Sequence, residues 1–231
     1  MRFVQLAENV MSVYVGDEIS LEVNRRIIQW VKAMKEIQQP GIEAIQHTYH
    51  QVGVYFNPDI VSVETIKWFM EKTYVSIQMT NIESAFTSKI VEIPVVYDGE
   101  DLLHIAQRQK ISTEDVVRLH SGKLYHIYFL GFSAGFPYLA GVEDAIAVPR
   151  LTVPRLKVSA GSVGIAEHQT GIYTVASPGG WQIIGHAVPL MFDKNRSNPC
   201  LVEAGDLIRF IPVQHNSSES FTSDLNTTLE V

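Results

Sequence analysis

KLYHIYFL (123–130) opens the part of the chain that decides the fold, and SVGIAE (162–167), GIYTVA (171–176), WQIIGH (181–186) and LIRFIPV (207–213) continue it. Each run is rich in β-branched and aromatic residues, and glycine or proline separates one run from the next. IAVP (146–149) fits the same pattern. No segment after Lys123 has a convincing helical period. Short strands at this spacing predict a closed or nearly closed β-barrel.

The segment before these runs mixes strand and helix signals. IVEIPVVY (90–97) reads as a strand, and Pro94 within it favours an edge or a bulge because proline cannot donate to a ladder. Two short helices are expected at residues 102–109 and 113–120. Ser112 lies three residues before Asp115, which is the spacing of a capping box at the start of the second helix.

The first third of the chain predicts a different unit. A strand or strand pair at residues 3–15 precedes a helix that Asp17 can cap, with apolar residues at helical spacing as far as Met34. Pro40-Gly41 stops this helix. A hairpin follows at residues 42–49 and 52–56, and Ser62 can cap a second helix. A further strand is expected within residues 76–86 or 90–97. This order is typical of a small α/β sandwich, with helices on one face of an antiparallel sheet.

The sequence therefore predicts an α+β protein with two domains. Residues 1–88 form the α/β sandwich and residues 89–213 form the β-barrel. Residues 214–231 are rich in Ser, Thr and Asn, a composition that predicts a disordered tail.

Composition limits the classes of function. The net charge is −7, which argues against a broad nucleic-acid or anionic-membrane surface. Cys200 is the one cysteine, so no intramolecular disulfide can form, and we expect it to be a packing residue in a reducing compartment. No apolar run approaches the roughly 18 residues of a membrane helix. We expect a cytoplasmic protein with neither nucleic acid nor membrane as partner.

Glycine and proline gather between Gly131 and Asp193, where nine of the 15 glycines and five of the 10 prolines lie. Ordinary barrel turns explain part of this density. The first motif within it is GFSAGFPYL (131–139), in which aromatic side chains and glycines can form an apolar platform beside exposed backbone amides. Its candidate binding residues are Phe132, Phe136, Pro137 and Tyr138.

The second motif, PRLTVPR (149–155), places Arg150 and Arg155 on a rigid loop. A guanidinium suits a carboxylate or a phosphate, although two surface arginines contribute little by themselves. The third motif runs from Ala160 to Trp181 and offers neutral donors and small residues whose N–H groups can hold an anion. Trp181 is equally well read as a core aromatic. The candidates in this motif are Ser162, Gln169, Tyr173, Ser177, Gly179, Gly180 and Trp181.

Several familiar sites are absent from the sequence. It contains no phosphate-binding P-loop, no G-x-G-x-x-G after a strand and no G-x-S-x-G elbow. Its eight histidines show no metal-ligand spacing, so no metal site is predicted. Ala33-Met34-Lys35 lies within a helix, so we expect no biotin on this chain.

The run from Gly131 to Asp193 closely resembles the KipI/PxpB family, also described as allophanate hydrolase subunit 1 or the carboxyltransferase subdomain of urea amidolyase. The resemblance covers residues 1–213 and is strongest at residues 120–193. It implies an N-terminal α/β domain and a cyclophilin-like β-barrel. The commonest bacterial role it implies is the B-type subunit of ATP-dependent 5-oxoprolinase, which acts with A-type and C-type subunits to convert 5-oxoproline to glutamate.

Two other roles follow from the same resemblance. One is inhibition of a histidine kinase, and the other is part of a urea carboxyltransferase, which is disfavoured because the chain has no biotin carrier segment. For the 5-oxoprolinase role we expect ATP and Mg²⁺ to be bound by the complex, and the isolated chain to be inactive. Arg150 and Arg155 are then the expected anion contacts, with His120 as an acid or base or as a structural histidine.

This sequence departs from the family pattern at several positions. Ala134 replaces a usual proline, Glu167 replaces a frequent glycine, and His186 replaces a usual arginine. A short Gly-Pro-Asp insertion is also missing after Glu100. The change at His186, a further candidate binding residue, replaces a permanent cation with a titratable one.

Overall fold

The computed structural model describes residues 1–78, 88–214 and 229–230. The chain divides into two compact units, Met1–Thr87 and Ser88–Val231. Each unit has an apolar core of its own, so the two are described separately.

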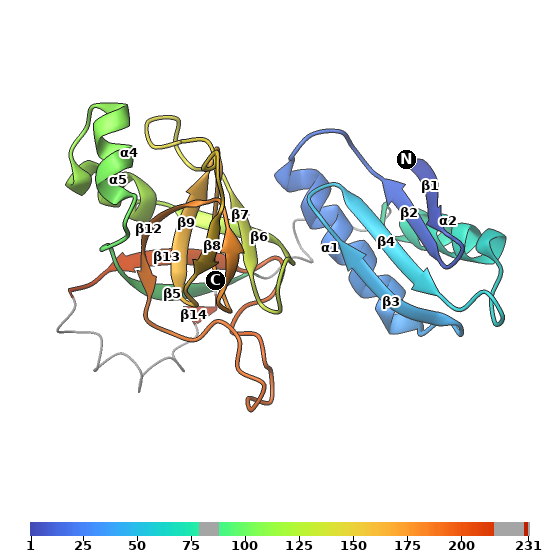
Figure 1. The fold of residues 1–231 in the computed structure, drawn as a ribbon. Coiled ribbons are helices and arrows are strands. Elements are labelled where there is room, and N and C mark those ends of the chain that lie inside the picture. The colour runs from blue at the N-terminus through green and yellow to red at the C-terminus, as the bar shows by residue number, and fades with distance from the viewer. Residues whose placement is uncertain (79–87, 215–228, 231) are drawn as a thin grey trace. The chain divides into compact units, whose positions relative to one another are not determined.

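The first unit is an antiparallel sheet covered on one face by two helices (Figure 1). The strands have the order β1-β2-β4-β3. The core between sheet and helices contains Trp30, whose indole N–H donates to the Thr73 hydroxyl at 2.8 Å and so joins the two helices. The elements are β1 (Arg2–Ala7), β2 (Val10–Tyr14), α1 (Leu21–Ile37), β3 (Ile42–His47), β4 (Gln51–Phe56) and α2 (Val63–Gln78).

The helix caps in this unit confirm one prediction and correct another. The Ser62 hydroxyl accepts from the Thr65 N–H at the start of α2, as expected. The N-cap of α1 is Ser20, which accepts from the Val23 N–H, and not Asp17. Of the two places expected for a further strand, residues 90–97 contribute to β5 of the second unit, and residues 76–78 at the start of the other belong to α2. Residues 79–87 lie outside the described part.

The second unit is a β-barrel of seven strands in the order β12-β9-β10-β7-β6-β13-β5, closed by pairing of β12 with β5 (Figure 1). β5 and β13 are parallel, and the other barrel pairs are antiparallel. The strands are β5 (Lys89–Val96), β6 (Leu124–Leu130), β7 (Pro137–Ala140), β9 (Ser162–Ala166), β10 (Gln169–Ile172), β12 (Gln182–Ala187) and β13 (Leu207–Pro212).

Pro94 lies inside the closed barrel and not at a free edge. β13 pairs along β5 on one side, and on the other side β12 pairs with Val95 and Val96. The Pro94 carbonyl accepts from the Val188 N–H. Pairing with β12 begins at Val95, the residue after Pro94, which itself has no N–H to donate.

Two helices, α4 (Leu102–Gln109) and α5 (Thr113–Ser121), lie together beside the barrel (Figure 1). The predicted capping signal at α5 is confirmed: the Asp115 N–H donates to the Ser112 hydroxyl, which donates in turn to the Asp115 carboxylate. No helix follows Ser121 in the part of the chain that the structure describes.

A separate ribbon pairs β8 (Arg155–Val158) with β11 (Ser177–Gly179). A short strand, β14 (Leu229–Glu230), pairs with the start of β5. Residues 215–228 and 231 of the predicted disordered tail lie outside the described residues. The predicted α+β class, with a small sandwich and a cyclophilin-like barrel, is confirmed.

His120 lies in the barrel core, at 0% exposure, between two hydroxyl groups. Its Nε2 is 2.9 Å from the Thr170 hydroxyl, which itself donates to the Gly164 carbonyl. Because that hydroxyl already donates its hydrogen elsewhere, Nε2 must donate to it. Nδ1 then accepts from the Tyr97 hydroxyl at 2.8 Å. These bonds fix one neutral tautomer.

Burial lowers the pKa of His120 to about 3. A histidine with an ordinary pKa near 6.5 in the unfolded chain binds a proton there before it does so in the folded chain. Acid therefore favours the unfolded state across the window from pH 6.5 down to about 3. His120 is consequently placed as a structural residue and not as the acid or base that was one of its two expected roles.

We predict that the wild-type chain loses about 2 kcal/mol more unfolding free energy between pH 7 and pH 5 than His120→Gln does, because glutamine cannot take up the proton. Urea denaturation at both pH values measures this difference. His104→Gln is the control, since His104 is exposed and should leave the wild-type pH dependence intact. Equal pH dependence in wild type and His120→Gln would contradict the assignment.

Candidate functional site

An aromatic cluster covers one part of the outer face of the barrel. Strand alternation separates it from the interior: Leu139 and Ile184 point into the barrel core, whereas Tyr138 and Ile183 pack on the outside. The rings meet mostly edge to face, with Phe136 at 5.4 Å from Tyr173. The cluster comprises Phe136, Tyr138, Val158, Ala166, Tyr173, Trp181 and Ile183.

Two paired glycines give this cluster its space. Gly164 on β9 lies opposite Gly171 on β10. A Cβ on Gly171 would lie 2.9 Å from the Phe136 ring and 2.8 Å from the Pro137 carbonyl, and one on Gly164 would lie 3.1 Å from Trp181. The glycines were expected to expose backbone N–H groups. At these two positions they instead allow aromatic rings to rest on the sheet.

Gly179 has the same role beneath Tyr173. A Cβ there would clash with the Tyr173 hydroxyl, so the ring can reach β11 only because residue 179 is glycine. Pro137 is buried at the start of β7. Phe129 stacks on Tyr138 with ring centroids 4.3 Å apart and extends the cluster along β6. The first and third sequence motifs therefore meet at one surface.

Phe132 is the exposed edge of this surface. Its side chain is 62% exposed, and its ring contacts Phe136 and Tyr173 at 5.6 and 6.1 Å. Its φ is +61°, a left-handed conformation that is unusual for a bulky residue. The Ser133 N–H donates to the Gly131 carbonyl at 2.6 Å across it, as in a γ-turn. A hydrogen bond between the hydroxyls of Ser133 and Thr174 fixes the loop.

Arg150 brings positive charge to the same surface. Its guanidinium carbon lies 5.9 Å from the centroid of the Trp181 ring, within the range of a cation–π contact, and the residue is exposed. Burial raises the pKa of Tyr138 and of Tyr173, and the Arg150 charge acts against this rise in both. The two tyrosines therefore stay neutral near pH 7 beside a permanent cation.

Arg155 is not available as the second anion contact. Its Nε lies 2.7 Å from Glu100, and its NH2 donates to both oxygens of Asp101 at 2.7 and 2.8 Å. Its NH1 also donates to the Trp181 carbonyl at 3.3 Å. Two carboxylates thus neutralise this guanidinium from within the chain. Arg155 is better described as a clamp that joins the ribbon to the start of α4 and to the segment before β12.

Asp101 completes this clamp. One of its oxygens also accepts from the Ile183 N–H at 2.6 Å, and its own N–H donates to the Ile183 carbonyl. The residue is only 8% exposed. Asp101 is not among the residues predicted from the sequence, although its place directly before the 102–109 helix was a usable signal. Trp181 is thereby held from both sides, by the clamp below and by the aromatic rings around it.

The remaining predicted residues do not all join this surface. Ser162 pairs with His186 in the ladder between β9 and β12. His186 is five residues after Trp181, which corresponds to about 16 Å along a strand, so this pair lies away from the aromatic surface. The His186 ring bonds to Asp98 at 2.7 Å. Gln169 is half-buried opposite Ala140 and Ala166. The Ser177 hydroxyl is buried without a hydrogen-bond partner among the described residues, and Gly180 accepts from the Leu151 N–H.

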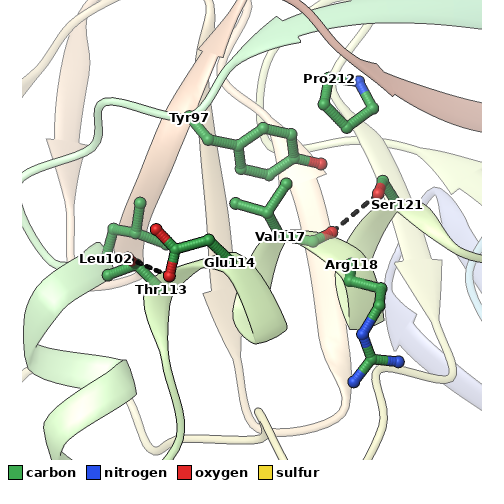
Figure 2. A pocket seen from close by; sticks show the side chains of 8 residues that line it. All are labelled: Tyr97, Leu102, Thr113, Glu114, Val117, Arg118, Ser121 and Pro212. Atoms are coloured by element: carbon green, nitrogen blue, oxygen red, sulfur yellow. Dashed lines mark hydrogen bonds between the residues drawn. The ribbon is translucent and has the colours of Figure 1, made fainter.

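A pocket of about 410 Å³ lies elsewhere on this unit, between α5 and the ends of β5 and β13 (Figure 2). Its charged lining side chains already have partners: Arg118 pairs with Asp115, and Glu114 accepts from Thr113. None of the sequence-predicted site residues lines it. Its lining residues are Tyr97, Leu102, Thr113, Glu114, Val117, Arg118, Ser121 and Pro212.

Comparison with known proteins places this geometry in a family. The family model described as "Carboxyltransferase domain, subdomain C and D" matches residues 1–202. The chain belongs to this family. Its relatives include a protein named as the B-type subunit of 5-oxoprolinase from Haemophilus influenzae, 34% identical over 91% of this chain and 97% of the relative. The proteins of the same name from Escherichia coli O157:H7 and Bacillus subtilis are 36% and 32% identical over 90% and 96% of this chain, and over 94% and 97% of their own lengths.

Solved structures share the fold of this chain. The protein TTHA0988 is 36% identical with a TM-score of 0.79, covering 89% of this chain and 40% of that one. The chain therefore spans well under half of that relative. A conserved uncharacterized protein from Pyrococcus horikoshii, PH0987, is 36% identical with a TM-score of 0.55, covering 94% of this chain and all of the other. Urea carboxylase from Kluyveromyces lactis, at 19% identity and a TM-score of 0.77, shares the fold over 99% of this chain and 24% of its own.

The structure gives a physical reason for one departure from the family pattern. Glu167 has φ +55°, so the glycine that the family often carries at this position suits the backbone better. His186 has its bond to Asp98, as described above. No feature of the structure explains Ala134.

We predict that Gly171→Ala lowers the unfolding free energy by about 1–3 kcal/mol, because the new methyl group must displace Phe136 or the Pro137 carbonyl. Gly180→Ala is the matched control, since a Cβ there meets its nearest neighbours at an ordinary 3.7 Å. Chemical denaturation compares the two. Similar stability of both variants would show that the glycine pair does not set the position of the rings.

We also predict that Asp101→Asn lowers the unfolding free energy by about 2 kcal/mol, since it leaves the partly buried Arg155 with one carboxylate in place of two. Glu92→Gln, which removes the exposed pair between Glu92 and Arg209, should cost less than about 1 kcal/mol. Equal effects on thermal or chemical unfolding would mean that the clamp contributes no more than a surface ion pair.

Proposed function

We propose that this chain is the B-type subunit of an ATP-dependent 5-oxoprolinase that converts 5-oxo-L-proline to L-glutamate, and that it forms the lactam-activating site together with a C-type subunit. The observation that carries the proposal is the end-to-end match, at 32–36% identity, with three relatives that are named as this component of 5-oxoprolinase. By contrast, urea amidolyase from Saccharomyces cerevisiae is 22% identical, and this chain covers 13% of it.

The chain's own residues suit part of such a site. Hydrolysis of an unstrained lactam needs activation of the amide, and ATP bound by the complex would supply it by phosphoryl transfer. In this chain Arg150 offers one positive charge beside aromatic rings, while Arg155 is neutralised internally. Among the described residues, no group of three His, Cys, Asp or Glu is placed to hold a metal ion. These residues fit one end of an anionic ligand and do not fit a complete site for ATP with Mg²⁺.

This partial fit supports a site shared between different chains of a complex. The C-type subunit would contribute the missing groups, and an A-type subunit would complete the turnover. The chain alone is then inactive. No helix in the described part of the chain is long and apolar enough to span a membrane.

Reconstitution tests the proposal. The chain is purified with its C-type subunit, the A-type subunit is added, and ATP hydrolysis and glutamate formation are measured with and without 5-oxoproline. We expect ATP hydrolysis that depends on 5-oxoproline in the three-component mixture and none from this chain alone. Lack of such activity, together with tight binding to a histidine kinase, would overturn the proposal in favour of the kinase-inhibitor alternative.

A further inference from the structure

We propose that Phe132 and Arg150 form a binding subsite for a small, flat monocarboxylate, and that this subsite takes the ring and the carboxylate of 5-oxoproline. The identity of the ligand rests on the proposed function. The existence of the subsite rests on the geometry of the aromatic surface.

The backbone at Phe132 is the first observation. A phenylalanine with φ +61° costs conformational free energy that a glycine would not. Its ring stands 62% exposed and rests by its edge on Phe136 and Tyr173. A strained turn that only exposes an aromatic ring to water does not stabilise the fold. We therefore infer that the turn presents the Phe132 ring to a ligand that packs on it.

The state of Arg150 is the second observation. Among the described residues, no salt bridge joins Arg150 to a carboxylate, whereas Arg155 in the same loop has two acidic partners. The Trp181 ring lies beneath the Arg150 guanidinium, and Trp181 is itself 5% exposed and held by the clamp. Arg150 is thus exposed, with the Trp181 ring within cation–π range, and its planar fork of donors suits bidentate binding of a carboxylate.

The composition of the surface selects the ligand. One cation and an apolar ring match a ligand with one negative charge and a small flat body. A nucleotide triphosphate carries several charges and needs further cations or a metal ion, which the described residues do not supply as a cluster. The Tyr173 ring contacts Phe132, and the Arg150 charge acts on both Tyr138 and Tyr173, so the same neutral rings link the two groups. The nearby carboxylates of Glu100 and Asp101 are paired with Arg155.

Ligand-observed NMR on the full chain tests the subsite without catalysis. We expect saturation transfer to 5-oxoproline and much weaker transfer to 2-pyrrolidinone, the same lactam without its carboxylate. Arg150→Met should remove this preference, while Arg118→Met, an equal loss of charge at an ion-paired arginine, should keep it. Binding of both lactams alike by the wild type, or no binding by the chain and by the complex, would overturn the subsite.

Phe132→Gly separates a structural role from a binding role. Glycine relieves the left-handed strain, so the thermal midpoint should not fall, yet 5-oxoproline binding should weaken at least several-fold. Unchanged binding in this variant would remove Phe132 from the subsite.

Kinetics of the reconstituted complex provides the third test. Arg150→Met should raise the KM for 5-oxoproline by about tenfold or more, from the loss of a charge-assisted hydrogen bond, and leave the KM for ATP unchanged. A raised KM for ATP with an unchanged KM for 5-oxoproline would overturn the proposal and assign Arg150 to phosphate. If the wild-type complex shows no 5-oxoproline-dependent activity, the proposed function fails, while the NMR result still decides the subsite.

Discussion

Contact between aromatic rings and bare backbone on the outer face of the barrel is the constraint on which the rest of the candidate site depends. Gly164 and Gly171 lie opposite each other, and the absence of both side chains lets Phe136 and Trp181 rest on the sheet. The outer side chains of a barrel strand ordinarily face water. Here two neighbouring strands have glycine at these positions, so aromatic rings form a second apolar layer outside the barrel core.

A two-stranded ribbon packs on this second layer and is anchored to the barrel by polar bonds. The β8–β11 ribbon pairs with itself and contributes Val158 to the cluster. Arg155 ties the ribbon to Asp101 and to the Trp181 carbonyl, and Asp101 ties the start of α4 to Ile183 on β12. These polar bonds gather three separate segments at the point where Trp181 supports Arg150. The charge of Arg155 therefore positions these segments, while Arg150 stays exposed beside Trp181.

Local patterns in the sequence predicted the fold well, and the site only in part. Strand runs, the two caps at Ser62 and Ser112, and the change from helical to strand periodicity are properties of neighbouring residues, so they can be read directly. The meeting of Phe132, Tyr173 and Trp181 could be anticipated from the density of glycine and proline. The partners of Arg155 could not, because Asp101 is 54 residues away and only the closed barrel brings the two together. His120 shows the same limit, since its tautomer is set by Tyr97 and Thr170, which come from distant parts of the chain.

An acidic chain that recognises an anion must do so locally. The net charge of −7 repels a carboxylate at long range, but salt screens such repulsion beyond about 8 Å at physiological ionic strength. The immediate surroundings of Arg150 then decide the binding. The Trp181 ring lies within cation–π range there, and the carboxylates of Glu100 and Asp101 are paired with Arg155. A single exposed guanidinium binds a carboxylate weakly in water, because water competes for both groups. The same contact strengthens when a second protein surface excludes that water. An open aromatic face with one cation is therefore what a shared site would present before its partner closes over it.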